Sequence, residues 1–99
     1  MEHRYGIQKI LTIKKYNRME NQELFNKVYA VLADIAECEI NIIKPDTDLL
    51  NEIGVTSLMG LEVLVELERE FNISLDEGIL IKMKTPKDIV EVLEEELAI

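Results

Sequence analysis

Apolar side chains recur at helical spacing in three long stretches of the chain, and no stretch alternates convincingly as a half-buried strand does. The first stretch covers about 21–37, with Asn21 as its N-cap, and its buried stripe comprises Leu24, Val28, Val31, Leu32 and Ile35. The second covers 57–71. The third covers 85–97, where the Thr85-Pro86 pair is a helix start signal, and its inward stripe comprises Ile89, Val90, Leu93 and Leu97. This pattern predicts an all-α fold.

Residues 39–56 form a long connection between the first two helices, because Pro45 blocks helix continuation. We expect the start of this connection to be anchored against the bundle by Ile40, Ile42 and Ile43. The segment 46–48, Asp-Thr-Asp, then offers caps for one short helical turn over 49–53.

A brief helix is expected between the second and third stretches. Ser74 and Glu77 have the spacing of a capping box, and Asp76 also suits a first turn. The helix would end near Met83 after burying Ile79, Leu80 and Met83. Gly78 weakens it by up to about 1 kcal/mol relative to alanine. We therefore predict a small four-helix bundle, with three main helices plus one short helix and a long loop between helices one and two.

The 57–71 helix carries two apolar arcs when it is drawn as a wheel. The core arc spans roughly 100° and comprises Gly60, Val63, Leu64, Leu67 and Phe71. The second arc comprises Leu58, Leu61 and Val65, and the outer side holds Glu62, Glu66, Arg69 and Glu70. The second arc either packs on a neighbouring helix or loop, or stays partly exposed as an acid-rimmed strip on which a basic, apolar enzyme surface could dock.

Charge divides the chain into two parts. Twenty acidic and eleven basic residues give a net charge of −9, which disfavours nucleic acid and favours partners with basic surfaces. Residues 1–20 hold five basic and two acidic side chains, a net of +3, so residues 21–99 carry −12. We predict a mobile basic extension over 1–20 and one helical domain over 21–99. Two alternatives to a mobile extension are that it folds back onto the acidic body and that translation starts naturally at Met19.

No uninterrupted apolar run is long enough for a membrane span, and the first residues lack the apolar core of a secretory signal. The single cysteine, Cys38, excludes an internal disulfide. We expect a monomer in the cytoplasm.

Catalytic groups are scarce. The single histidine, His3, lies in the basic extension, so no base is available for a serine nucleophile in the helical domain. Asp46 and Asp48 have the spacing of the first ligands of a calcium loop, but Asn51 and Ser57 stand where such a loop needs glycine and glutamate. We predict neither an enzyme nor a metal site.

The remaining chemistry lies at 54–58, Gly-Val-Thr-Ser-Leu, where a glycine turn delivers two hydroxyl residues to a helix start. Thr56 or Ser57 can cap the helix by accepting from free N–H groups of its first turn. The alternative is that one of them caps while the other, Ser57, points outward and carries a covalent group.

Several motifs together favour that alternative. Ser57-Leu58, Glu62 and the ending Leu67-Glu68-x-Glu70-Phe71 resemble helix two of acyl carrier proteins, and the 85–90 segment, Thr-Pro-Lys-Asp-Ile-Val, resembles the start of their last helix. The resemblance covers about 21–97. It implies a carrier with 4′-phosphopantetheine esterified to Ser57 by a phosphopantetheinyl transferase, and an acyl or aminoacyl thioester (D-alanine among the candidates) exchanged with loading and processing enzymes.

The partner-recognition surface implied for this chain comprises Thr56, Leu58, Met59, Leu61, Glu62, Val65 and Glu66. Thr56 stands where many acyl carriers have aspartate, and Met59 stands where an acid often follows the Ser-Leu pair. These departures favour a specialised, stand-alone carrier. They also leave open an unmodified, acidic interaction module that binds a protein partner through the 57–71 helix.

Overall fold

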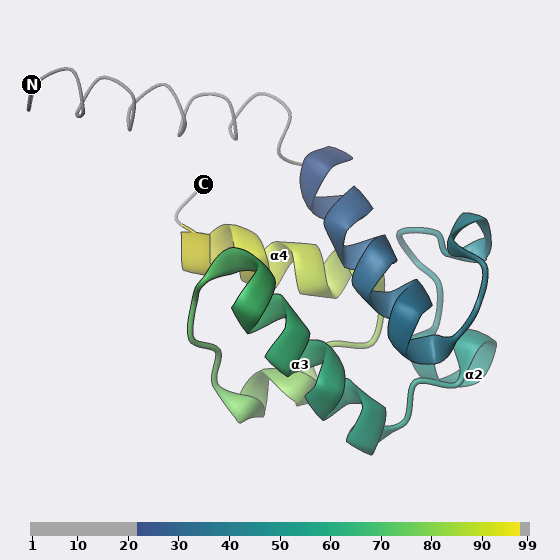
Figure 1. The fold of residues 1–99 in the computed structure, drawn as a ribbon. Coiled ribbons are helices and arrows are strands. Elements are labelled where there is room, and N and C mark those ends of the chain that lie inside the picture. Colours follow the sequence, from purple (N-terminus) through teal and green to yellow (C-terminus); the bar gives the residue numbers. More distant parts are fainter. Residues whose placement is uncertain (1–21, 98–99) are drawn as a thin grey trace, which may run out of the picture.

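The computed structural model describes residues 22–97, and every regular element within them is helical. The first helix is described over 22–36. After it come the 3-10 turn η1 (Ile40–Ile42), the short helix α2 (Leu49–Ile53), α3 (Ser57–Phe71), the 3-10 helix η2 (Glu77–Ile81) and α4 (Pro86–Leu97), as Figure 1 shows. The predicted all-α bundle, with its three main helices and its long first loop, is confirmed. The expected basic extension and the Asn21 cap lie outside the described residues.

The three main helices share one aliphatic core. The first helix contributes Leu24, Val28 and Leu32, which are fully buried. The partner residues on the other two helices are Val63, Leu64, Leu67, Ile89, Val90 and Leu93. All of them belong to the stripes that helical spacing predicts, and their burial is the main stabilising term for a domain of this size. The other predicted stripe residues, Val31, Ile35, Phe71 and Leu97, are only partly buried.

The long connection is held by backbone hydrogen bonds to the start of α4. The N–H of Leu49 donates to the Lys84 carbonyl at 3.0 Å, and the N–H of Lys87 donates to the Pro45 carbonyl at 2.9 Å. Thr47, a buried polar residue, accepts from the Lys44 N–H at 2.7 Å. Because its buried polar groups are paired, this irregular segment can close one side of the core.

Two expectations about the connecting segments were wrong. Ile40 and Ile42 are about half exposed, at 48% and 52%, and only Ile43 of this trio is buried, because the tight η1 turn points the other two outward. The brief helix before α4 is a 3-10 helix over Glu77–Ile81. Its cap is Asp76, whose carboxylate accepts from the Gly78 N–H at 2.8 Å, and not Ser74.

The turn between α2 and α3 depends on a left-handed glycine. Gly54 ends α2 at φ 71° and ψ 26°, and the next N–H, that of Val55, returns to the Leu49 carbonyl at 2.8 Å. The Gly54 N–H donates to the Leu50 carbonyl at 3.1 Å, which is the αL type of helix C-cap, and glycine adopts the positive φ of this cap without the strain that a Cβ would cause. This cap turns the chain sharply, directly before α3.

We predict that Gly54→Ala lowers the free energy of unfolding by about 1 kcal/mol, because a Cβ is disfavoured at positive φ. A Cβ built there meets nothing within 4 Å, so backbone conformation and not crowding sets the cost. Denaturant unfolding would measure it.

Gly78→Ala is the matched control, since its added Cβ meets the Asp76 carboxylate oxygen only at an ordinary 3.4 Å and no positive φ is involved. We expect this variant to be neutral or slightly stabilised. Equal losses in the two variants would contradict the role given to the left-handed turn.

Candidate functional site

Thr56 and Ser57 have different roles at the start of α3. Thr56 is the N-cap, with extended backbone, and its hydroxyl oxygen accepts from the Met59 N–H at 3.3 Å. Ser57 is the first helical residue and its side chain is exposed. The hydroxyl that the helix needs for capping is therefore supplied by Thr56, and the Ser57 oxygen is left accessible.

The helix start also provides hydrogen-bond donors beside Ser57. In α3 the N–H groups of Met59 and Gly60 both return to Thr56, to its hydroxyl and its carbonyl. The N–H groups of Ser57 and Leu58 have no hydrogen-bond acceptor among residues 22–97. Unpaired N–H groups at a helix N-terminus, together with the helix dipole, favour an anionic group such as a phosphate ester.

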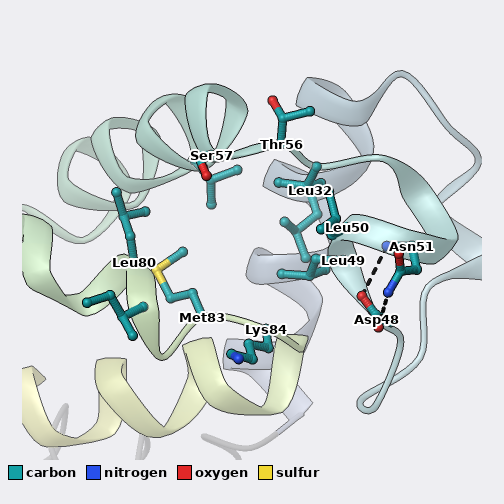
Figure 2. Close-up of a pocket in the computed structure, with 14 residues that line it drawn as sticks. Leu32, Asp48, Leu49, Leu50, Asn51, Thr56, Ser57, Leu80, Met83 and Lys84 are labelled. Carbon is teal, nitrogen blue, oxygen red and sulfur yellow. Dashed lines mark hydrogen bonds between the residues drawn. The ribbon is translucent and has the colours of Figure 1, made fainter.

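A cavity of about 370 Å³ opens next to Ser57 between α2, α3 and η2. Figure 2 shows Ser57 at one rim and Lys84 at the far end. The walls between them are mainly apolar and come from Leu32, Leu49, Val55, Val63, Leu80 and Met83. The open hydroxyl therefore adjoins an apolar space.

Gly60 allows η2 to approach α3 closely at this cavity. The glycine is buried, and a Cβ built on it would come within 3.3 Å of the Leu80 Cδ2. Leu80 therefore lies against the α3 backbone and forms one wall of the cavity. A larger residue at Gly60 would push this wall away from the helix.

Asp48, at the edge of the cavity, has a lowered pKa. The Asn51 backbone N–H at 3.0 Å, and then its side-chain amide at 2.8 Å, donate to the carboxylate, and the Lys84 charge adds a smaller attraction. These interactions outweigh partial desolvation and hold the pKa of Asp48 below its usual 3.8. The carboxylate caps α2 in its charged form, which fixes one edge of the cavity.

The expected partner-recognition residues fall into two groups. Leu58, Leu61 and Val65 form an exposed apolar strip, with 72%, 37% and 49% of their surfaces accessible. Exposed Glu62 and half-exposed Glu66 lie beside it. The strip forms one side of a groove of about 390 Å³, whose other side is Asp34 and Ile35 of the first helix; we call it the α3 groove. The second apolar arc of the 57–71 helix is therefore partly exposed and is not covered by a neighbouring helix or loop in the described part of the chain.

Met59 differs from the other recognition candidates, because its half-buried side chain packs against the core. Thr56 is exposed but is occupied as a cap. Sequence reasoning also missed the exposed rim residues Leu50 and Ile81, at 59% and 78% accessible, on the cavity side of Ser57. The only signal in the sequence was an apolar residue in each of two short helices, which looked like core.

Comparison with known proteins identifies the family. Residues 26–93 match the family model described as the phosphopantetheine attachment site. The acyl carrier protein of Onion yellows phytoplasma is 33% identical over 67 residues, which is 68% of this chain and 88% of that protein. That of Coprothermobacter proteolyticus is 28% identical over 79 residues, 80% of this chain and 96% of that protein.

Similarity extends to much larger proteins. A non-reducing polyketide synthase of Hypocrea jecorina is 37% identical over 76 residues, 77% of this chain, but this chain spans only 3% of that protein's length. The solution structure of the apo doublet acyl carrier protein from prodigiosin biosynthesis superposes with a TM-score of 0.66 at 21% identity, covering 76% of this chain and 36% of that one. The latter likeness supports the fold.

The chain belongs to the phosphopantetheine-attachment family, which includes the acyl carrier proteins. Members of this family are carriers and not enzymes, and their cofactor is covalent 4′-phosphopantetheine, attached by phosphopantetheinyl transferases. Among residues 22–97, no helix has the length and apolar character needed to cross a membrane.

We predict that Thr56→Ala lowers the free energy of unfolding by about 1 kcal/mol, because α3 loses its side-chain cap. Ser57→Ala should change it by less than about 0.5 kcal/mol, since an exposed hydroxyl without a structural partner is removed. Chemical denaturation of both variants tests the division of roles. A larger loss for Ser57→Ala than for Thr56→Ala would show that the two hydroxyls have been assigned the wrong way round.

The depressed pKa of Asp48 predicts a pH effect with a definite sign. Its contribution to stability is fully present above the unfolded-state pKa and is lost as pH falls through the lower folded-state pKa. Carboxyl-carbon NMR should give a titration midpoint below 3.8, and Asn51→Ala should raise it part of the way toward 3.8, because the side-chain amide donor is lost while the backbone N–H remains. A midpoint at or above 3.8 in the unsubstituted protein would contradict the assignment.

Proposed function

We propose that Ser57 is the residue that carries 4′-phosphopantetheine, and that the protein is a specialised, stand-alone carrier of an acyl group held as a thioester. The observation that supports this most strongly is the exposed Ser57 hydroxyl at the first position of α3, with capping left to Thr56. Thr56 can therefore keep capping α3 while Ser57 carries the covalent group.

The surroundings of Ser57 fit the group. A phosphodiester on its oxygen would lie beside the free N–H groups at the positive end of α3. The side chain is exposed at a cavity rim, so a transferase can reach it while the arm is left free to move. When bound, the arm supplies a terminal thiol that holds the cargo as a thioester.

The protein's own part in the attachment is limited to presenting the Ser57 oxygen. That oxygen forms a bond to the phosphorus next to the pantetheine of coenzyme A, the pyrophosphate bond breaks, and the nucleotide phosphate leaves. The Ser57 proton must go to a base on the transferase, because the described part of this chain offers no histidine near Ser57.

The cavity favours an acyl cargo over an aminoacyl one. Its walls are largely aliphatic, so transfer of an alkyl chain from water into it is favourable, whereas a charged amino group would lose hydration there. Identities of 33% to 37% to segments of polyketide synthases, against 24% to 33% to four acyl carrier proteins, are in keeping with a specialised pathway.

The proposal of a stand-alone carrier is supported by two acyl carrier proteins, because the matched region covers 88% and 96% of their lengths. We propose that it acts as a monomer in the cytoplasm, and that its loading and processing enzymes bring basic surfaces to the acids beside the apolar strip. The alternative of an unmodified interaction module would use the same strip but leave Ser57 free.

Intact-mass measurement after incubation with a phosphopantetheinyl transferase and coenzyme A tests the assignment. We expect wild type to gain the mass of one phosphopantetheine and Ser57→Ala to gain none. Ser74→Ala is a matched control, because Ser74 is the other exposed serine of the domain and is also followed by leucine. It should be modified as wild type is. Modification of Ser57→Ala, or none in any variant with several transferases, would contradict the proposal.

A further inference from the structure

The α3 groove is an apolar surface without a partner among residues 22–97. Leu58 is the most exposed residue of its strip, with 72% of its surface accessible. The groove lies on the side of α3 toward the first helix, whereas the cavity beside Ser57 lies toward η2. A segment that covered the groove would therefore leave the cavity open.

The rim of the groove is acidic. Asp34, Glu62 and Glu66 line it, and a second hollow, formed by Val31, Glu66, Arg69 and Glu70, continues the same seam between α3 and the first helix. Arg69 is the basic side chain on this seam, and it is paired with Glu66 at 3.3 Å. The occupant that suits such a surface combines positive charge with a few apolar side chains.

The first twenty residues of this chain have that composition. They carry a net charge of +3, from Arg4, Lys9, Lys14, Lys15 and Arg18 against Glu2 and Glu20. Their central part also contains four large aliphatic residues, Ile7, Ile10, Leu11 and Ile13. A second copy of the acidic domain is less suitable, because a net charge of −9 on each chain opposes the approach of two such faces.

The reach of this segment matches the position of the groove. Along the first helix, from residue 22 to Ile35 at the groove, the distance is about 20 Å at a rise of 1.5 Å per residue. A return over that length takes roughly six residues if extended and roughly thirteen if helical. Counted back from residue 21, these two limits place a residue between about 8 and about 15 level with the groove. That stretch contains three of the four aliphatic residues and three lysines.

We propose that the basic N-terminal segment docks in the α3 groove of its own chain, with its aliphatic residues on the strip and its lysines beside Asp34, Glu62 and Glu66. Because the two are covalently joined, a weak contact suffices for substantial occupancy. The contact itself does not depend on modification of Ser57.

Paramagnetic NMR on the full chain tests the contact. A nitroxide is attached to Gln8→Cys in a Cys38→Ser background, which leaves one thiol. We expect strong loss of amide signal at 31–35 and 58–66 and little loss at η2, on the other side of α3. The loss should persist on dilution and should diminish at high salt, which screens the exposed charges.

Charge reversal provides the matched comparison. Glu62→Lys/Glu66→Lys should abolish the local signal loss, whereas Glu91→Lys/Glu95→Lys should keep it. The second pair makes the same change in charge at the same spacing, on exposed positions of α4. If Glu62→Lys/Glu66→Lys does not fold, the salt dependence of the signal loss in the chain with an unsubstituted groove tests whether charge attraction holds the contact.

Three results would overturn the proposal. The signal loss could be spread evenly over the domain, or centred on an element other than the groove. It could arise only between chains, when isotope-labelled protein is mixed with spin-labelled protein. It could be the same in both charge-reversed variants. These measurements use the chain without phosphopantetheine, so they remain valid even if Ser57 is never modified.

Discussion

The turn from Gly54 to Thr56 is the constraint on which the site depends. The left-handed glycine ends α2, the Val55 N–H closes the turn on Leu49, and Thr56 then caps α3. Since capping is done by the preceding residue, Ser57 stands at the first helical position with its oxygen accessible. The same turn places α2 against the cavity, so the open hydroxyl and the apolar space beside it have one structural cause.

The two sides of α3 serve different purposes in this account. Toward η2, Gly60 lets Leu80 approach the helix backbone and form a wall of the cavity. Toward the first helix, Leu58 and Val65 stay exposed beside acids, where another polypeptide can bind. For the function that we propose, cargo beside Ser57 and a partner on the strip would not compete for the same space.

Local rules predicted the three main helices and the start of α4 well. Thr85 and Asp88 cap the start of α4 reciprocally, and the apolar stripes became the core, because capping and helical spacing depend on neighbours in sequence. The exposed Ile42, the 3-10 form of η2 and the cavity were not predicted. They depend on how distant segments pack, which a hydropathy pattern does not contain. Assignment of Ser57 came from a family resemblance, not from periodicity.

The most direct test of the central claim is fragment-ion mass spectrometry on the protein purified from the cells in which it is naturally made. We expect the fragments to place one phosphopantetheine on Ser57 and to show Thr56 and Ser74 unmodified. A protein that is unmodified under all growth conditions, or that carries the group on another residue, would contradict it.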